Sequence, residues 1–403
     1  MGKLLFLSSL LPNKNKSFFI SNSLGAISNA NDSLQRALLD GFKQNLVDVY
    51  ALNVPNIGAF PFKFKKVKSI GFKFDNTDAL VGYNIDFYNI NLLKHFSIQK
   101  NLNNYITKNK HILSGVDYVF VYDLYTPFLK ALKLIKSINP NCKIIVMIPD
   151  IIGFTHSNKG FLHRQLEENN RRTLANAKSE IDGFVYLTKS MGEMLPLEVN
   201  NKPFIVIEGV LNPQNKIYKK NINVSNKVIF YSGSLDLRHG IMNLIEAFLL
   251  SKNKDIELHV CGDGDGKGVM LEKIKNISTI KYLGQIAREE VIKKQSEAFL
   301  LINPRSSKGE FTKYSFPSKV IEYYLSGTAT FMYRLQGIPE EYFDYCFSLE
   351  DESINALSNF FDDLENMQIE EMLEMGRMAR SFVVETKNAK VQTEKIIKFT
   401  NSL

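Results

Sequence analysis

The sequence has few cysteines and no long apolar run. Its three cysteines, Cys142, Cys261 and Cys346, are widely spaced in 403 residues, which excludes a disulfide framework and a thiolate metal cage. No stretch approaches the ~18 consecutive apolar residues that a membrane-spanning helix needs. The first residues lack the apolar core of a signal peptide, and Phe6 stands where the myristoylation pattern needs Ser or Thr. These absences predict a reduced, soluble, cytoplasmic protein.

Positive charge is concentrated in the first half of the chain. The formal net charge is +8, and residues 1–210 carry 25 Lys and Arg against 16 Asp and Glu. The remainder is therefore close to neutral. A basic half indicates an anionic partner on that side, such as a phosphate-bearing substrate or a membrane surface. A solvated lysine-rich surface accounts for the same charge equally well.

Both halves of the chain repeat an apolar run, a loop and an amphipathic helix. This rhythm predicts βα units with mainly parallel sheets, and the length suits two or three domains at ~150 residues each. We expect an α/β protein with two Rossmann-like, doubly wound domains facing each other across a cleft. The expected strands are 3–7, 48–52, 118–122, 143–148, 183–187, 204–207, 227–231, 256–261, 280–283 and 298–302.

Helices are expected between and after these strands, and one polar segment divides the chain. The helices are predicted at 33–45, from 190, and at 240–250, 268–275, 288–295, 317–326, 354–365 and 370 to the end. Residues 211–226 are polar and basic without apolar periodicity, which predicts a linker between an N-terminal domain, 1–210, and a C-terminal domain, 227–403. We expect the last helix, about 385–403, to be able to pack back on the first domain.

The most informative segment, Asn303 to Thr328, reads NPRSSKGEFTKYSFPSKVIEYYLSGT. It predicts a loop and then a helix with Ser315 as N-cap, Pro317 in its first turn and Gly327 at its end. Lys319 in the first turn opposes the helix dipole, which makes sense if the helix N-terminus binds an anion such as phosphate. Glu322 lies on the same face and could accept two ribose hydroxyls. A surface helix with an internal Lys–Glu pair is the simpler alternative.

Several motifs in this segment and around it resemble one enzyme family. Phe316-Pro317-Ser318-Lys319, Glu322-Tyr323 and Gly327-Thr328 are similar to the donor-site helix of glycosyltransferase family 4, retaining enzymes with the GT-B fold. The variant is similar to that of many bacterial polysaccharide-assembly enzymes. The resemblance covers residues 227–345 and is weaker in the first half. Further matches are the segments 231–235, 261–264, 282–284, 148–150 and 185–188.

The resemblance implies a site for a nucleotide-sugar donor. Glycines at Gly233, Gly262 and Gly264 would let the backbone approach the diphosphate or the sugar. Arg305, Lys319 and the helix N-terminus would stabilise the departing diphosphate, and Glu322 would bind the ribose. The complete set of expected donor-binding residues is Gly233, Ser234, Arg238, Gly262, Gly264, Gly284, Arg305, Tyr314, Ser315, Phe316, Pro317, Ser318, Lys319 and Glu322.

The sequence departs from the family pattern at two places. The family has two glutamates eight positions apart, but Tyr314 stands eight before Glu322, so either Glu310 or the Tyr314 hydroxyl would reach the sugar. The family's Arg after the first glycine is Ser234 here, and its Lys nearby is missing. Arg238, Arg305 or Lys308 would have to supply the cation, and His239 is either a phosphate ligand or a loop histidine.

A metal and a cofactor are not expected. The run Gly262 to Gly266 contains an Asp-x-Asp, which holds a divalent cation in other glycosyltransferases. No histidine or further carboxylate cluster accompanies it to complete an oxygen-ligand shell. The family that the sequence resembles generally works without a metal.

The first half offers candidates for binding an acceptor and a membrane. The small residues of the loop from Ser21 to Asn31 could admit a substrate, and Asp150 could orient or deprotonate an acceptor hydroxyl or simply cap a helix. The run from Pro61 to Phe74 interleaves phenylalanines with lysines. That pattern suits either contact with anionic lipid or an edge strand protected by lysines. No recognition motif for nucleic acid accompanies the charge.

Together these features predict a retaining glycosyltransferase of surface polysaccharide synthesis, peripheral on the cytoplasmic membrane face. It would transfer a sugar from a nucleotide-sugar donor to a glycan or lipid-diphosphate-linked acceptor, with Glu310 and Asp150 as catalytic candidates. A nucleotide-sugar epimerase of the same fold is one alternative. A catalytically weakened scaffold of an assembly complex is the other, motivated by Tyr314 and Ser234.

Overall fold

The computed structural model describes residues 2–24, 29–75, 80–91, 93–150, 161–211 and 227–403. The chain divides into two compact units. The first contains Met1–Pro213 and Asn388–Leu403, and the second contains Gln214–Lys387. The segment expected as a linker, 211–226, lies outside the described residues except for Leu211, which forms a β-bridge with Asn388 in the first unit.

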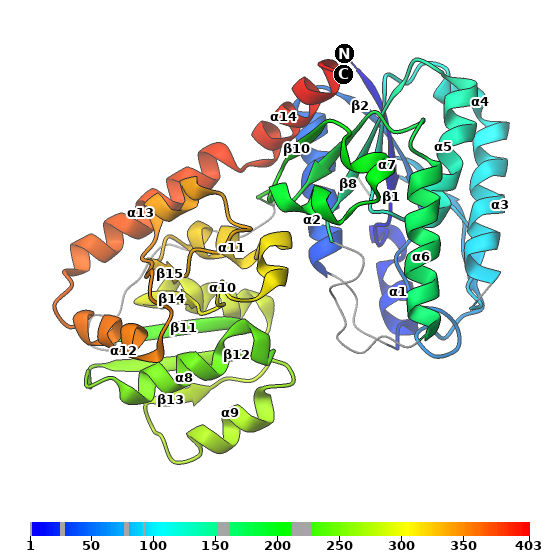
Figure 1. The fold of residues 1–403 in the computed structure, drawn as a ribbon. Helices are drawn as coiled ribbons and strands as arrows, with labels where there is room; N and C mark the ends of the chain where they lie inside the picture. Colours follow the sequence, from blue (N-terminus) through cyan, green and yellow to red (C-terminus); the bar gives the residue numbers. More distant parts are fainter. Residues whose placement is uncertain (1, 25–28, 76–79, 92, 151–160, 212–226) are drawn as a thin grey trace. The chain divides into compact units, whose positions relative to one another are not determined.

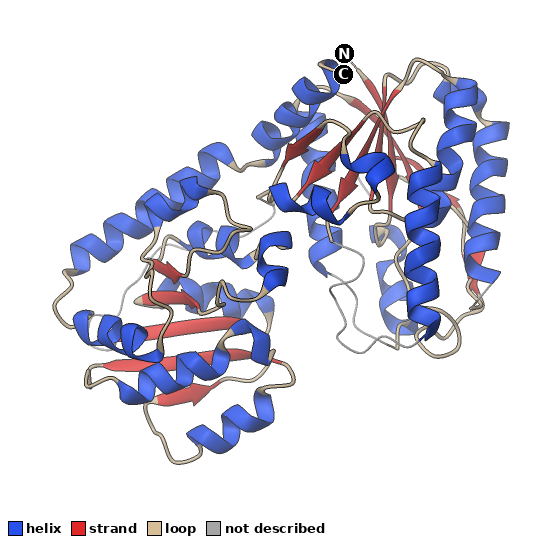
Figure 2. Ribbon diagram, in the orientation of Figure 1, coloured by secondary structure: helices blue, strands red, loops and turns tan. Residues whose placement is uncertain are grey.

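The first unit is built on an eight-stranded sheet with the order β10-β9-β8-β7-β1-β2-β5-β4 (Figures 1 and 2). All neighbouring strands are parallel except β4 and β5. A small antiparallel pair, β3 and β6, lies outside this sheet. The strands are β1 (Lys3–Ser8), β2 (Asp48–Asn53), β3 (Lys68–Ser69), β4 (Phe72–Lys73), β5 (Val81–Asn84), β6 (Phe87–Tyr88), β7 (Tyr118–Tyr122), β8 (Lys143–Ile148), β9 (Gly183–Tyr186) and β10 (Phe204–Val206).

Helices cover both faces of this sheet, as its continuous apolar strands require. The helices α3, α5 and α6 form one layer, and α2 packs with α14 in another (Figure 1). The helical elements are η1 (Asn13–Asn15), α1 (Lys16–Asn22), α2 (Asn29–Gln44), α3 (Leu93–Lys108), α4 (Lys110–Leu113), α5 (Thr126–Ile138), α6 (Phe161–Asn176), η2 (Lys189–Met194), α7 (Leu197–Asn200) and α14 (Ala389–Asn401).

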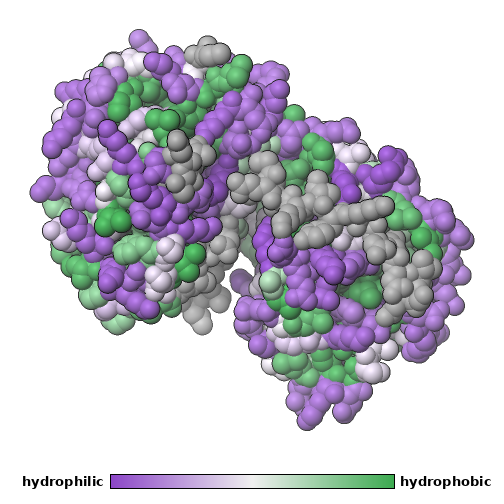
Figure 3. All heavy atoms as spheres, turned by 180° about the vertical axis from the view of Figure 1, so that it is seen from behind, coloured by the Kyte–Doolittle hydropathy of each residue, from purple (hydrophilic) through white to green (hydrophobic). Residues whose placement is uncertain are grey.

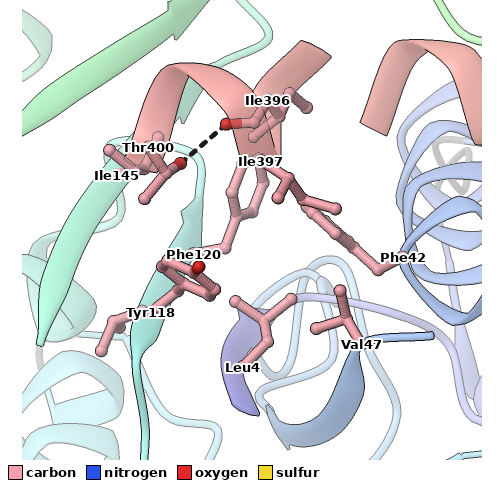
Figure 4. Close-up of a pocket in the computed structure, with 10 residues that line it drawn as sticks. Leu4, Phe42, Val47, Tyr118, Phe120, Ile145, Ile396, Ile397 and Thr400 are labelled. Atoms are coloured by element: carbon pink, nitrogen blue, oxygen red, sulfur yellow. Dashed lines mark hydrogen bonds between the residues drawn. The ribbon is translucent and has the colours of Figure 1, made fainter. Parts of the chain in front are cut away.

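The C-terminal helix α14 completes the core of the first unit. Figure 4 shows Ile396 and Ile397 of this helix facing Leu4, Phe120 and Phe42, with an enclosed space of only about 10 Å³ between them. The approach of α14 to α2 is so close that a Cβ on Gly41 would lie 2.2 Å from the carbonyl oxygen of Ala389. This helix is therefore an integral part of the first unit.

The second unit contains a five-stranded, all-parallel sheet with the order β13-β12-β11-β14-β15. Its strands are β11 (Lys227–Ser234), β12 (Ile256–Asp263), β13 (Ile280–Tyr282), β14 (Leu300–Asn303) and β15 (Thr330–Met332). Its helical elements are η3 (Leu237–His239), α8 (Ile241–Leu250), α9 (Lys267–Ile274), α10 (Arg288–Glu297), η4 (Glu310–Tyr314), α11 (Lys319–Ser326), η5 (Glu340–Tyr345), α12 (Ile354–Asp363) and α13 (Ile369–Thr386).

The α/β architecture with parallel sheets is confirmed, but several local predictions are wrong. The helix predicted at 317–326 begins at Lys319, because Ser315 is extended (φ −141°, ψ 119°) and Ser318 is the N-cap. The helix predicted from residue 370 to the end is two helices. They separate at Lys387 and Asn388, whose side chain caps α14 by accepting from the Val391 N–H at 2.9 Å.

The run from Pro61 to Phe74 contains two short strands, β3 and β4, and β4 forms one edge of the eight-stranded sheet. Two predictions for the first unit need correction. The loop expected from Ser21 to Asn31 includes the end of α1 and the beginning of α2. The helix predicted from residue 190 is the 3-10 helix η2, followed by the single-turn helix α7.

Among the described residues, no helix combines the length and the apolar character that crossing a membrane requires. Hydrophilic side chains cover much of each unit on the face seen in Figure 3, with small hydrophobic groups between them.

Candidate functional site

Glycines mark the carboxyl edge of the sheet in the second unit, at three neighbouring strands. Gly233 near the end of β11 is paired with Gly262 in β12, whose N–H donates to the Gly284 carbonyl after β13 at 3.0 Å. A Cβ on Gly262 would lie 1.8 Å from the Gly233 oxygen, and its φ of +142° excludes most side chains. Ligands of parallel sheets bind at this edge, where the strand ends pack backbone against backbone.

The loop after β12 is folded tightly onto the loop after β11. A Cβ on Gly264 would lie 2.6 Å from the Leu235 carbonyl carbon. Asp265 accepts a hydrogen bond from the Leu237 N–H at 3.1 Å, and Asp263 pairs with Lys267 at 3.5 Å. The two aspartates of the Asp-x-Asp run therefore hold local structure, and the described residues contain no group of three or more potential metal ligands.

Arg305 lies two residues after the end of β14 and is a buried cation. Its exposed fraction is 8%, and it forms no ion pair with the residues that the structure describes. Its Nε atom is buried without a hydrogen bond. The guanidinium lies 4.4 Å from the centre of the Phe311 ring. Burial lowers the pKa of Arg305 to about 10, so the side chain stays charged at neutral pH. A charge removed from water requires an opposite charge nearby, which points to an anionic ligand.

Two other basic side chains surround the same phenylalanine. Arg238 lies 5.7 Å from the Phe311 ring centre and is already engaged by Asp236, with Nε 2.9 and 3.1 Å from the two carboxylate oxygens. This contact lowers the pKa of Asp236 to about 2. Burial and the charge of Arg305 lower the pKa of His239, which favours its neutral form at pH 7. In the part of the chain that the structure describes, Arg305 is therefore the cation of this cluster that has no ion-pair partner.

The beginning of α8 fixes the loop that carries Arg305. Gly240 has a φ of +78°, and a Cβ at this position would lie 2.0 Å from the Pro304 oxygen. On its other side the loop is held by Glu352, which accepts from the Ser306 hydroxyl at 2.5 Å and from the Ser307 N–H at 2.9 Å. The guanidinium is thus positioned by a rigid segment.

Lys319 and Glu322 lie together at the start of α11, as their spacing predicts. The Lys319 Nζ is 3.9 Å from Glu322 Oε1, and its Cε is 3.4 Å from where a Cβ of Gly233 would lie. Glu322 Oε1 also accepts from the Gln295 amide at 2.7 Å, and Arg288 lies 3.2 Å from Oε2. The Glu322 carboxylate is therefore held in place on one side and faces a half-exposed arginine on the other.

The remaining predicted donor residues divide into buried and exposed ones. Tyr314 and Phe316 are each 6% exposed, and the Phe316 ring packs 5.4 Å from that of Tyr342. Glu310 and Ser318 are exposed, and Ser315 and Pro317 are partly buried. Tyr314 and Phe316 thus anchor the segment, whereas Glu310 presents its carboxylate to solvent.

Both acceptor candidates belong to the first unit. Asp150 is exposed and follows β8, at the carboxyl edge of that sheet. Part of the loop from Ser21 to Asn31, residues 25–28, lies outside the described residues. Gln295 and Phe311 were missed by sequence reasoning, because neither forms part of a motif and both reach the site only through the packing of α10 and η4.

Comparison with known proteins adds independent findings. Residues 213–382 match the family described as glycosyl transferases group 1. No curated protein matches the chain in sequence.

Among solved structures, sucrose-phosphate synthase from Thermosynechococcus elongatus has a TM-score of 0.64 at 12% identity, covering 99% of this chain and 98% of that one. The lipopolysaccharide outer core galactosyltransferase WaaB has a TM-score of 0.61 at 11% identity, covering 99% of both chains. The Anabaena protein HepE in complex with UDP-glucose has a TM-score of 0.56 at 13% identity, covering 100% of both chains. At this identity the likenesses show the fold, which is that of GT-B glycosyltransferases.

Proposed function

We propose that this glycosyltransferase is a retaining enzyme of family 4. It would transfer a sugar from a nucleoside-diphosphate sugar to a glycan or lipid-linked glycan acceptor in the synthesis of a surface polysaccharide. The observation that carries the proposal is Arg305, a buried cation that lacks an ion pair with any described residue. The leaving diphosphate of a nucleotide sugar is an anion of the required kind, and the similar Anabaena structure is a complex with UDP-glucose.

The residues around Arg305 fit the parts of such a donor. Gly233 and Gly262 let the ends of β11 and β12 pack backbone against backbone, and Lys319 lies beside Gly233 to supply a second cation. The Glu322 carboxylate would accept the ribose hydroxyls in place of Arg288, whose side chain is 63% exposed and can be solvated by water instead. Charge that develops on the leaving diphosphate would be stabilised by these fixed cations, and loss of one such contact typically lowers kcat ~10²–10³-fold.

In this proposal the acceptor hydroxyl attacks the sugar on the same face from which the diphosphate leaves. The configuration of the sugar is therefore retained. The leaving phosphate would accept the proton of the acceptor hydroxyl, so no side-chain nucleophile is required. Glu310, exposed at the start of η4, is a better candidate for contacting the sugar than the buried Tyr314. Asp150 is proposed to orient the acceptor hydroxyl. Neither role needs a bound metal.

A peripheral membrane contact is proposed for the basic part of the first unit. Phe62 has 85% of its surface exposed and is followed by the exposed residues Lys63, Lys65 and Lys66. The Leu24 N–H donates to the Lys63 carbonyl at 3.0 Å, which places the 55%-exposed Leu24 beside them. Exposed apolar side chains among lysines suit a surface of anionic lipid, where a lipid-linked acceptor would be found.

The test is a binding titration with UDP, GDP, ADP and CMP on the unaltered chain, Arg305→Met and Glu322→Ala. We expect one diphosphate to be selected and to bind at least ~10-fold more weakly to Arg305→Met, since a hydrogen bond to a charged group contributes ~1.5–3 kcal/mol. Glu322→Ala should also weaken binding through the ribose. Because Arg305 is buried without an ion pair, its replacement by Met should not lower the thermal stability.

Arg377→Met is the matched control, because Arg377 is an exposed arginine of the same unit, paired with Glu374. It should bind the nucleotide as the unaltered chain does. Binding of no nucleotide at millimolar concentration would overturn the proposal and favour the scaffold alternative. Conversion of a nucleotide sugar without any acceptor would favour the epimerase.

A further inference from the structure

A polar cavity of about 230 Å³ lies in the first unit, at the carboxyl edge of its sheet. Strand β1 is flanked by β2 on one side and β7 on the other, so the chain winds outward from β1 in both directions. Such a switch point is where open parallel sheets bind ligands. The lining includes Ser9 after β1, Asn56 after β2 and Asp123 after β7.

One wall of the cavity holds a carboxylate on a strained backbone. Asp123 has a φ of +75°, in the left-handed region that few residues other than glycine adopt. Its Oδ1 accepts from the Leu124 N–H at 2.7 Å, and its N–H donates to the Met147 carbonyl at 3.0 Å. Strain of this kind is retained where the surrounding structure enforces it, often at a ligand site. The carboxylate can accept hydrogen bonds from a hydroxyl group in the cavity.

The lining also includes Lys94 and His95. The Lys94 ammonium donates to the Ile57 carbonyl at 2.5 Å and lies 5.7 Å from the Phe87 ring centre. It has no ion pair with a carboxylate of the described residues, and burial lowers its pKa to about 8, which leaves it largely protonated at neutral pH. The neighbouring His95 ring lies 5.4 Å from the Tyr125 ring, and both side chains line the cavity. A lysine in this position would be stabilised by a ligand anion.

The cavity differs from the other spaces in this unit. The space beneath α14 is apolar and has a volume of about 10 Å³, so it is a packing gap in the core. The space at Asp123 corresponds to roughly eight water molecules at ~30 Å³ each, which is the scale of one sugar ring. Its lining includes both the Lys94 donor and the Asp123 carboxylate acceptor.

We propose that this cavity binds one sugar residue that carries a carboxylate or phosphate group. Its anionic group is held by Lys94 and His95, and one of its hydroxyls donates to Asp123. The assignment of this sugar as part of the acceptor rests on the proposed transferase function. It names the acceptor class, an anionic glycan or a sugar phosphate, and adds Asp123, Lys94 and His95 to the residues that would contact the acceptor.

The test measures binding of glucuronate, glucose 6-phosphate and glucose to the full chain by saturation-transfer NMR and calorimetry. We expect saturable binding of at least one anionic sugar, at least ~10-fold tighter than that of glucose. The two anionic probes separate a carboxylate from a phosphate as the recognised group. Equal binding of glucose and both anionic sugars, or no saturable binding of any, overturns the proposal.

Variants then locate the site. Lys94→Met should abolish the preference for the anionic sugars, whereas Lys100→Met, an exposed lysine on the same helix, should leave it unchanged. Asp123→Asn keeps the backbone geometry and should weaken all three sugars by a similar factor. A preference that survives Lys94→Met, or that is equally lost in Lys100→Met, contradicts the assignment.

Nucleotide binding, measured on the same samples, separates this inference from the proposed function. If nucleotides bind in an Arg305-dependent way but no sugar binds, only the sugar site is overturned and the proposed function stands. Sugar binding without nucleotide binding leaves the cavity assignment standing and removes its role as an acceptor site.

Discussion

The two sheets end differently at the same edge. In the first unit, three neighbouring strands end in buried polar side chains: the Ser8 hydroxyl donates to Asn53 Oδ1 at 2.8 Å, and Asn53 Nδ2 donates to Asn84 Oδ1 at 2.7 Å. All three residues are fully buried. In the second unit, the corresponding places hold Gly233 and Gly262, with Gly284 after the third strand.

The two parallel sheets therefore present their carboxyl edges to a ligand in different ways. The polar side chains of the first unit satisfy one another and close the strand ends, so a ligand has to use the cavity beside them, near Asp123. The glycines of the second unit let the strand ends pack backbone against backbone, and they place no side chain of their own between the backbone and a ligand. Side chains would recognise the ligand of the first unit, and backbone and fixed cations that of the second.

Gly262→Ala should have the largest effect of these changes, because it disturbs the packing of the strand ends in the second unit. The added Cβ would meet the Gly233 oxygen at 1.8 Å and the residue would keep a φ of +142°, so we expect the second unit to lose at least about 4 kcal/mol of stability. Urea unfolding followed by circular dichroism measures this loss. Gly268→Ala is the control, because Gly268 lies in α9 with open space around it and should gain ~0.5–1 kcal/mol. Equal stability of the two variants would show that the edge is not tightly packed.

Asn53→Ala tests the buried polar strand ends of the first unit and should have the next largest effect on stability. It removes the hydrogen bonds that the amide makes with Ser8, Asn84 and the Leu10 backbone, while Asn84 keeps its bond to the Ile70 carbonyl. We expect a loss of about 3 kcal/mol in the free energy of unfolding, because unsatisfied buried groups are costly. Hydrogen exchange should show the loss in β1, β2 and β5. Asn104→Ala, at an exposed position of α3, should change the stability by less than about 0.5 kcal/mol.

Asp123→Asn tests the first unit further, through the pH dependence of its stability. Burial raises the pKa of Asp123 from 3.8 to about 6, with a further contribution from the charge of Asp150. Ionisation of this group therefore favours the unfolded chain, and its cost grows between about pH 4 and pH 6. The Asn variant should become more stable than the unaltered chain by about 3 kcal/mol above pH 6 and match it below pH 4.

Asp150→Asn supplies the check on this pH dependence. Removing its charge should shift the midpoint of the Asp123 effect to lower pH. A stability difference that is the same at pH 4 and pH 7 would mean that the Asp123 carboxylate is not the titrating group.

The buried strands were the part of the fold that the sequence predicted best. The runs 118–122 and 143–148 coincide with β7 and β8, because strands buried on both faces are continuously apolar. The short strand β5 and the helix α3 were not predicted. In α3 the apolar residues Ile98, Leu102 and Ile106 recur every four positions, but polar residues between them weaken the pattern. The break at Lys387 was missed although Asn388 is a typical cap.

The glycines and cations of the second unit could be located from the sequence because each follows a predicted strand or begins a predicted helix. Their roles in donor binding stay predictions. Asp123 and Lys94 could not be paired in this way, since they come from β7 and α3 and meet only through the order of the strands. The apolar run before Asp123 was the one signal that the sequence offered for it.

The path of the chain also affects when the first unit can form. The chain leaves this unit at Pro213 and returns at Asn388, and its core is complete only when α14 covers Leu4 and Phe120. During synthesis at ~5–20 residues per second, the intervening segment takes on the order of 10–35 seconds. For that time the nascent N-terminal sheet exposes an apolar surface, which makes it a binding target for chaperones while the second unit is still being made.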